Sequence, residues 1–271
     1  MPTYIGHMIR SLAPLASTLF LGLALPAFAQ DPAEMAKIDI LPGWQMENGH
    51  RMAAIRVQLA PGWHTYWRTP GETGIPPTFE LSGSDNLARM DLHWPVPELF
   101  SENGLWYLGY EHELILPIEL IPEKDGDIRL SGTMDLGVCK DICMPLRATL
   151  NATLTPDGAG GAQTEIRNAL ADQPKRIINA TCKAAPISDG MRVSVDMSVP
   201  ELGPYEVAVI EHPDRSVWIS EAAVERAGGK IKVESDLVPS DAQPFFIDRS
   251  QLTITVIGNG TAYEAQGCSG N

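Results

Sequence analysis

The sequence predicts an all-β protein with two consecutive β-rich domains, the first an antiparallel β-sandwich. Three observations carry this prediction. Short segments that alternate apolar and polar residues recur along the chain, turn-forming residues separate them, and helical periodicity is confined to one short stretch. Turn formers are plentiful, with 24 glycines and 22 prolines in 271 residues. Seven or eight such segments in about 120 residues are typical of an antiparallel sandwich.

In the first domain, the strands are expected at 37–41, 52–59, 63–68, 79–81, 90–94, 113–120, 127–136 and 146–154. Within 52–59, Ile55 and Val57 alternate with Arg56, which predicts one buried and one solvated face. Pro117 suggests that 113–120 is an edge strand, because proline cannot donate a ladder hydrogen bond.

The segment 95–109 is expected to be a long loop. It mixes apolar and acidic residues, and its aromatic residues share no periodic face. Loops of this composition often carry function. The alternative is that Phe100 and Trp106 simply fill the end of the core.

Later segments predict a linker, a short helix and a second set of strands. The linker at 155–161 is rich in Gly, and the helix at 162–173 is expected to stop at Pro174. Alternation returns after it, and strands are expected at 191–199, 205–211, 216–220, 230–235, 245–248, 252–257 and 261–265. The predicted organisation has four parts: a leader at 1–29, a first domain at 30–155, a linker with its helix at 156–175, and a second β-sandwich domain at 176–271.

The first 29 residues have the pattern of a secretory signal. Arg10 is their only Lys or Arg, an apolar run follows, and Ala27-Phe28-Ala29 forms an A-x-A cleavage site. The uninterrupted apolar run 19–25 is shorter than the ~20 residues that cross a membrane. We therefore expect an exported, soluble protein without membrane insertion after cleavage, in a compartment that permits disulfides.

Charge excludes one class of partner. The chain has 20 Lys and Arg against 34 Asp and Glu, a net charge of −14, and loss of Arg10 with the leader makes it more negative. Such a surface repels nucleic acid and anionic lipid.

Two of the four cysteines, Cys139 and Cys143, lie in the segment Gly137-Val138-Cys139-Lys140-Asp141-Ile142-Cys143-Met144-Pro145. In a straight strand their Cα atoms would be about 13 Å apart, too far for a disulfide. Residues 140–142 have the length of a three-residue hairpin turn, which would bring the two cysteines together. One helical turn would also do so, but Pro145 disfavours it. The alternatives are a redox pair, a purely structural disulfide and two buried thiols.

The other two cysteines, Cys182 and Cys268, bracket the second domain. In the chain-entropy model a bridge between them stabilises by about 4.6 kcal/mol, against about 2 kcal/mol for a Cys139–Cys143 bridge. The distant pair is therefore interpreted as structural and the close pair as redox-active, although the sequence leaves other pairings open.

Several motifs in 51–154 resemble the N-terminal periplasmic domain of the DsbD family of thiol:disulfide interchange proteins. The matching elements are Leu59-Ala60-Pro61-Gly62-Trp63-His64-Thr65-Tyr66-Trp67, His93-Trp94-Pro95-Val96-Pro97, Gly109-Tyr110, Leu114-Ile115-Leu116-Pro117 and the cysteine segment 137–145. The layout is most similar to the copper-tolerance, ScsB-type branch. There an immunoglobulin-like domain carries the cysteines and a second β domain follows.

The resemblance implies a periplasmic protein-disulfide reductase activity without a cofactor, in a family also associated with cytochrome c biogenesis. Cys143 matches the cysteine that forms the mixed disulfide with partners, and Cys139 the one that resolves it. His64 and Tyr66 match aromatic positions beside the pair. Phe100, with Glu98 next to it, falls in the position of a cap loop that shields the cysteines.

Two departures from the family pattern matter. The cysteine spacing is often longer in the family, and this sequence lacks the eight-helix membrane domain and the thioredoxin domain. We therefore expect a separate membrane thiol-electron transporter as electron donor and thioredoxin-like periplasmic proteins as partners.

The alternative function is Cu(I) binding in copper tolerance. Cys139, Cys143 and Met144 are soft donors suited to Cu(I), with His64 or His93 as a third kind of ligand.

Overall fold

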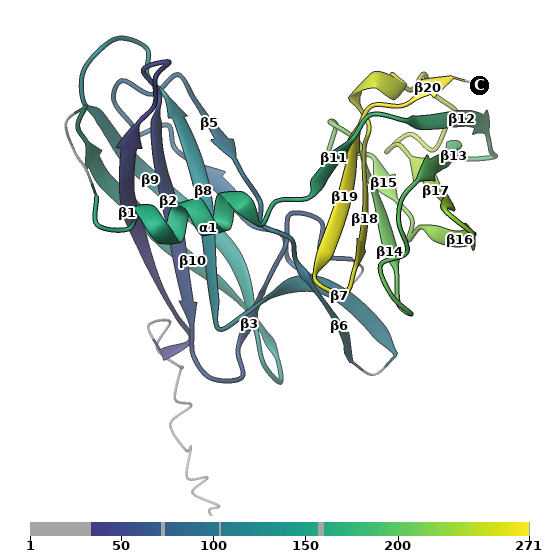
Figure 1. The fold of residues 1–271 in the computed structure, drawn as a ribbon, viewed down its shortest axis with the longest axis horizontal. Coiled ribbons are helices and arrows are strands. Elements are labelled where there is room, and N and C mark those ends of the chain that lie inside the picture. Colours follow the sequence, from purple (N-terminus) through teal and green to yellow (C-terminus); the bar gives the residue numbers. More distant parts are fainter. Residues whose placement is uncertain (1–33, 72–73, 103, 157–159, 271) are drawn as a thin grey trace, which may run out of the picture. The chain divides into compact units, whose positions relative to one another are not determined.

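Strands dominate the computed structural model of the protein, as the sequence predicts (Figure 1). The structure describes residues 34–71, 74–102, 104–156 and 160–270, so the predicted leader lies outside the described residues. The described residues form one compact unit. Within it, an immunoglobulin-like antiparallel domain is followed by a second β-rich domain.

The first domain consists of two sheets. One has the order β1-β2-β8-β5, formed by Ala36–Gln45, Arg51–Leu59, Glu113–Ile121 and Arg89–Leu92. The other has the order β10-β9-β3-β7-β6, formed by Cys143–Leu154, Ile128–Cys139, His64–Tyr66, Leu105–Glu111 and Glu98–Glu102, and β4 (Thr78–Glu80) also pairs with β9. Alternate residues of both sheets meet in one apolar core, in which Ile55, Val57 and Trp67 are fully buried.

The edge position suggested by Pro117 is wrong, because β8 lies between β2 and β5. The structure shows how proline is tolerated there. β5 ends at Leu92, and the Pro117 carbonyl accepts a hydrogen bond from the His93 amide just beyond that end. In an antiparallel strand the nitrogen of Pro117 faces the same side, where the neighbouring ladder has already stopped.

The prediction of a loop at 95–109 is also wrong, because β6 and β7 form a hairpin there (Figure 1). The hairpin signal is Asn103-Gly104, of the kind that favours tight turns between strands. Gly104 has φ +83°, a conformation that glycine adopts without strain. Pairing of Phe100 with Tyr107 gives these aromatic residues the common face that the sequence pattern concealed.

The helix α1 (Gln163–Ala171) lies across the outer face of the first sheet (Figure 1). Its buried Ile166 packs with Leu41, Met52 and Ala54 of β1 and β2. Pro174 follows the helix, as expected. Among the described residues, no helix is both long and apolar enough to cross a bilayer.

The second domain also consists of two sheets. The first has the order β11-β19-β18-β14, formed by Lys175–Ile177, Thr261–Gln266, Thr253–Gly258 and Val207–Glu211. The second has the order β15-β17-β13-β12-β20, formed by Trp218–Ile219, Lys230–Val238, Met191–Ser198, Ala180–Pro186 and Ser269–Gly270, and β16 (Ala223–Ala227) also pairs with β17. These strands enclose a core of their own.

Candidate functional site

Cys139 and Cys143 form a disulfide at the tip of the β9–β10 hairpin. Cys139 ends β9, Cys143 begins β10, and their Cα atoms are 4.1 Å apart. The Lys140 amide donates to the Ile142 carbonyl, which closes the three-residue turn that the spacing predicts. The two cysteines differ in access: Cys139 is only 2% exposed, whereas Cys143 is exposed beside Ile142, itself 64% exposed.

The Tyr66 hydroxyl contacts both sulfur atoms. Its oxygen lies 2.9 Å from the Cys139 Sγ and 3.2 Å from the Cys143 Sγ. β3 brings it there, because His64 is in register with Cys139 and Thr65 donates through Oγ1 to the Gly137 carbonyl at 2.8 Å. Tyr66 itself is buried, so its hydroxyl is directed at the pair rather than at solvent.

Two glycines make room for the Tyr66 ring. A side chain at Gly137 would begin 3.1 Å from the ring carbons and 2.7 Å from Ile75, and one at Gly74 would begin 2.7 Å from the ring's Cδ1. A side chain at Gly74 would come closer to the ring than real Cβ contacts allow, and one at Gly137 would be tight against the ring and would clash with Ile75.

An aromatic stack continues from Tyr66 across the hairpin β6–β7. His64 stacks on Tyr107 with ring centroids 4.5 Å apart, and Tyr107 stacks on Phe100 at 5.0 Å. The Tyr107 hydroxyl is also 3.4 Å from the His64 Nδ1. Tyr66, Tyr107 and Cys139 form a small apolar cluster apart from the main core, with Phe100 packed against it.

Of the predicted cap-loop residues, Phe100 lies against this cluster and Glu98 does not. Both stand on the strand β6 rather than in a loop, which corrects the expected loop conformation. Glu98 is exposed and in register with Gly109, and within the described part of the chain no contact joins its carboxylate to the cysteines.

Sequence reasoning missed Tyr107 and Gly137 as parts of this site. The hairpin signal at Asn103-Gly104 predicts a partner strand for Phe100 and so could have revealed Tyr107. Gly137 inside an alternating strand is the usual sign of close approach by another group.

The second disulfide, Cys182–Cys268, joins β12 to the segment before β20. Cys182 is buried in the core of the second domain, and Arg249 covers the region by donating through Nη1 to the Cys182 carbonyl at 3.3 Å. This bond has no neighbouring aromatic hydroxyl among the described contacts.

Among the proposed copper ligands, Cys139 and Cys143 are bonded to each other and His64 is in register with Cys139. Met144 packs against the main core, whereas Cys139 belongs to the separate aromatic cluster. His93 stands at the end of β5, where its Nε2 is 3.3 Å from the Glu119 carboxylate. The same carboxylate is 2.5 Å from the His50 Nδ1. This hydrogen bond with His50 and, less strongly, the one with His93 lower the pKa of Glu119 despite partial burial.

A comparison with known protein families finds a match for the first domain. Residues 37–155 match the family model described as thiol:disulfide interchange protein DsbD, N-terminal. The match spans both sheets of the first domain, including β3 and the β9–β10 hairpin. The resemblance noted from the sequence motifs is therefore confirmed for this DsbD-type segment. No curated protein matches the chain.

Among solved structures, the chain is similar to the N-terminal periplasmic domain of ScsB from Proteus mirabilis. The TM-score is 0.65 at 22% sequence identity, and the similarity covers 90% of this chain and 97% of that one. At this identity the likeness shows the fold. It extends beyond the DsbD-type segment, since the part matched by the family model ends at residue 155.

Proposed function

We propose that the protein exchanges disulfides in the periplasm, passing reducing equivalents to partner proteins through Cys139 and Cys143. The observation that carries the proposal is the geometry at the tip of the hairpin. One cysteine is exposed and one is buried, and a single buried tyrosine contacts both sulfur atoms through its hydroxyl. The match of residues 37–155 to the DsbD N-terminal model supports the same chemistry.

The exchange proceeds in two steps that balance electrons. The thiolate of reduced Cys143 attacks one sulfur of a partner disulfide, forming a mixed disulfide and releasing one partner thiolate. The thiolate of Cys139 then attacks the Cys143 Sγ, which forms the Cys139–Cys143 bond and releases the second partner thiolate. Two electrons pass to the partner, whose thiolates take up two protons, and a separate thiol donor must afterwards reduce the pair.

The difference in exposure between Cys143 and Cys139 indicates which cysteine attacks the partner and which resolves the mixed disulfide. A partner disulfide can approach the exposed residue Cys143, whereas Cys139 is buried in a cluster with Tyr66 and Tyr107. Cys139 needs to reach only the Cys143 sulfur, and the hairpin holds their Cα atoms 4.1 Å apart. The Tyr66 hydroxyl can donate to whichever sulfur carries the negative charge, which stabilises the attacking and the leaving thiolate.

Partners of the thioredoxin type fit this chemistry. An exchange domain needs a donor that reduces it and an acceptor that oxidises it. We propose thioredoxin-like periplasmic proteins as partners and a separate membrane thiol transporter as the source of electrons. The structural disulfide role of Cys182–Cys268 is part of the same proposal, because an oxidising compartment would preserve that bond.

Trapping of mixed disulfides tests the proposal. In Cys139→Ser, Cys143 can attack a partner but nothing resolves the product, so adducts should accumulate on a non-reducing gel of exported proteins. Cys143→Ser should trap few or none. Adducts in Cys143→Ser alone would reverse the roles. No adducts in either variant, with stoichiometric Cu(I) held by the reduced wild type against a competitor, would replace exchange by copper binding.

A further inference from the structure

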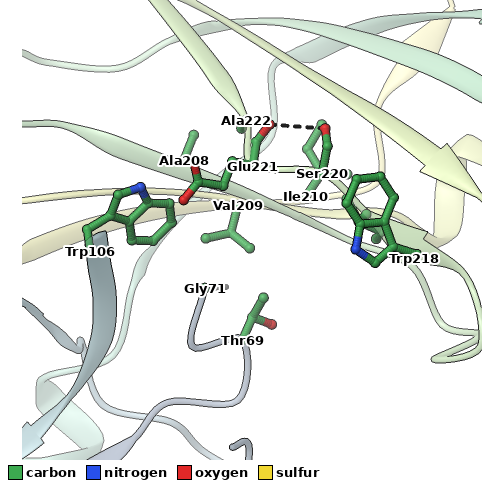
Figure 2. Close-up of a pocket in the computed structure, with 11 residues that line it drawn as sticks. Thr69, Gly71, Trp106, Ala208, Val209, Ile210, Trp218, Ser220, Glu221 and Ala222 are labelled. Carbon is green, nitrogen blue, oxygen red and sulfur yellow. Dashed lines mark hydrogen bonds between the residues drawn. The ribbon is translucent and has the colours of Figure 1, made fainter. Parts of the chain in front are cut away.

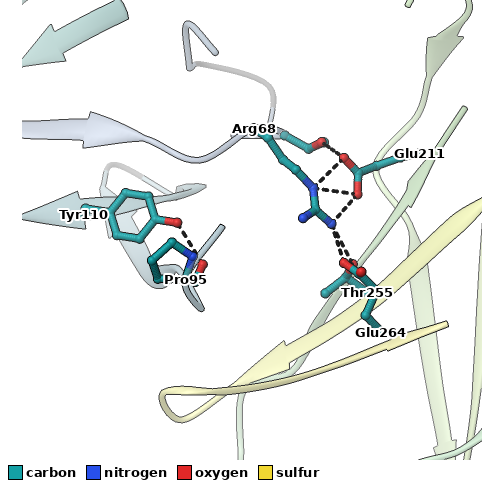
Figure 3. Close-up of polar contacts among 7 residues, drawn as sticks. Arg68, Pro95, Tyr110, Glu211, Thr255 and Glu264 are labelled. Carbon is teal, nitrogen blue, oxygen red and sulfur yellow. Dashed lines mark hydrogen bonds and ion pairs between the residues drawn. The ribbon is translucent and has the colours of Figure 1, made fainter. Parts of the chain in front are cut away.

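The segment that follows β3 connects the cysteine site with the second domain. Its Arg68 donates through Nε to both carboxylate oxygens of Glu211, at 3.0 and 3.1 Å, and through Nη2 to Oε2 at 2.8 Å (Figure 3). Nη2 also contacts the Glu264 carboxylate and lies 3.4 Å from the Thr255 Oγ1. Glu211, Thr255 and Glu264 stand on β14, β18 and β19, so one guanidinium spans three strands of the second domain.

This cluster is a firm anchor because it is largely screened from water. The side chains of Arg68, Glu211 and Glu264 are 19, 21 and 25% exposed. Burial alone would lower the pKa of Arg68, but Glu211 and then Glu264 more than offset it and raise the pKa. Thr69 adds a hydrogen bond from its hydroxyl to the Glu211 Oε1 at 2.6 Å. Removing Arg68 would therefore leave two partly buried carboxylates without their cation.

The same segment continues back to the Tyr66 ring. The Trp67 amide donates to the Leu108 carbonyl, and the Leu108 amide donates to the Pro70 carbonyl, both at 3.0 Å. Beyond Pro70, the chain returns at Gly74 onto the Tyr66 ring, as the close approach of these residues shows. The residues on either side of Arg68 and Thr69 thus contact the Tyr66 ring or the strand β7 beside it.

Side-chain packing between this segment and the second domain is incomplete. A pocket of about 520 Å³ opens beside Thr69 and Gly71, with Trp106 and Trp218 at its sides and β14 along it (Figure 2). A second pocket of about 400 Å³ borders Arg68 and Pro70. Val209 of β14 belongs to the same apolar core cluster as Trp67, so apolar contact also joins the two domains. The cluster around Arg68 is the polar attachment of the segment to β14.

We propose that Arg68 is a positioning residue through which the second domain holds the Tyr66 hydroxyl on the cysteine pair. Held by Glu211 and Glu264, Arg68 keeps the segment pressed on the Tyr66 ring. Loosening it would lengthen the contacts from the hydroxyl to the sulfurs. The proposal deepens the proposed exchange function and rests on it for its biological role, but the chemistry can be measured with small molecules alone.

The test follows the pH profile of iodoacetamide alkylation of the reduced full chain, from about pH 5 to about pH 10. A phenol that donates to the thiolate favours the charged form, so Tyr66→Phe should move the midpoint upward by about one pH unit. Arg68→Gln should move it in the same direction by less. In Tyr66→Phe/Arg68→Gln, the second change should add nothing further, since the hydroxyl that Arg68 positions is already absent.

The double variant separates positioning from charge. If the Arg68→Gln shift persists in the Tyr66→Phe background, Arg68 acts through its own charge, and positioning is wrong. The other charged and titratable groups near the pair, Lys140, Asp141, His64, Tyr107 and Glu111, are unchanged in these variants. Arg68→Lys keeps the charge but loses the fork geometry, so it should give an intermediate shift. If Arg68→Gln does not fold, Arg68→Lys and Glu264→Gln replace it in the test.

Arg226→Gln is the matched control. Arg226 donates to both oxygens of Glu206, at 2.5 and 2.7 Å, and is similarly buried, but within the second domain. It should lower the melting temperature about as much as Arg68→Gln does and leave the alkylation profile unchanged. An unchanged profile in Arg68→Gln as well would reduce Arg68 to a structural contact. Absence of trapped partners with the expected profile would overturn the exchange function and leave the positioning role intact.

Discussion

Cys139–Cys143 joins the two strands of a single hairpin, whereas Cys182–Cys268 joins residues 86 positions apart. The first bond has one exposed cysteine and a tyrosine hydroxyl in contact with both sulfur atoms. The second has a buried Cys182 and links β12 to the C-terminal segment of its domain. The two pairs of cysteines therefore differ in loop length, in access and in the polar group placed beside them.

The comparison shows that loop length suits a disulfide to a structural role, whereas access suits it to a redox role. A bond that closes a long loop removes much entropy from the unfolded chain, so it is suited to stabilise the fold. A bond that closes a tight hairpin contributes less to stability and can open while the strand pairing around it remains. Access of one sulfur then permits attack by a partner thiol. Three predictions test this contrast, beginning with the largest expected effect, and a fourth concerns the acid stability of the first domain.

The two disulfides should differ most in the rate at which a thiol reductant opens them. Under mild dithiothreitol at neutral pH, Cys139–Cys143 should open on the order of 100-fold faster than Cys182–Cys268, because the former includes an exposed cysteine and the latter joins a buried to a half-buried one. Differential alkylation followed by mass mapping of the labelled peptides measures both rates in one sample. Earlier labelling of Cys182 and Cys268 would contradict the assignment of roles.

Removing one disulfide or the other should lower the stability of the protein by different amounts. Cys182→Ser/Cys268→Ser should lower the free energy of unfolding by about 4–5 kcal/mol, and Cys139→Ser/Cys143→Ser by about 2 kcal/mol. Urea denaturation of the three proteins under oxidising conditions measures the difference. Equal losses would mean that the hairpin bond is as much a structural element as the distant one.

Shielding of the hairpin pair depends on Phe100, which stacks on Tyr107 above the cluster that contains Cys139. Phe100→Ala should speed alkylation of the reduced pair several-fold, on the order expected for exposing a partly covered thiol. Leu105→Ala is the control, since Leu105 lies on the same hairpin and is already 46% exposed. A rate equal to that of wild type would show that Phe100 only fills the end of the sheet.

The smallest expected effect is on acid stability: protonation of Glu119 at low pH should destabilise the first domain. The hydrogen bond with His50, and also that with His93, lowers the pKa of Glu119 in the folded protein. Its contribution to stability is therefore present above its unfolded pKa of about 4.5 and disappears as the pH falls through the lower folded value. Glu119→Gln should flatten the loss of urea stability in this range, with Glu113→Gln as control. Parallel curves for wild type and Glu119→Gln would contradict this role.

Local signals determined several elements from the sequence. Lys140-Asp141-Ile142 between two alternating strands predicts the hairpin, and with it the approach of Cys139 to Cys143. Alternation also located most strands of both domains, and Pro174 ended the helix. The signals failed where neighbours decide the outcome. Pro117 reads as an edge residue, yet it stands in a central strand beside a neighbour that stops short.

The aromatic segment 95–109 shows the same limit. Its residues have no common periodicity along the chain, so the common face of Phe100 and Tyr107 exists through pairing of β6 with β7. Phe245–Asp248 shows the reverse case. Its apolar residues predict a strand, but no strand forms there and Phe246 is 89% exposed. Strand formation requires a partner, and a single segment carries no information about its partner.

The sequence by itself determined the all-β class, the tight cysteine hairpin, the acidic surface and the likeness of the first domain to the DsbD N-terminal family. These depend on composition, period and short spacings, which are properties of neighbouring residues. Only the tertiary structure placed the Tyr66 hydroxyl on both sulfurs, 73 and 77 positions away. Only it joined Arg68 to Glu211 and Glu264, 143 and 196 positions away. Contacts at such separations depend on how whole sheets pack, which no local pattern encodes.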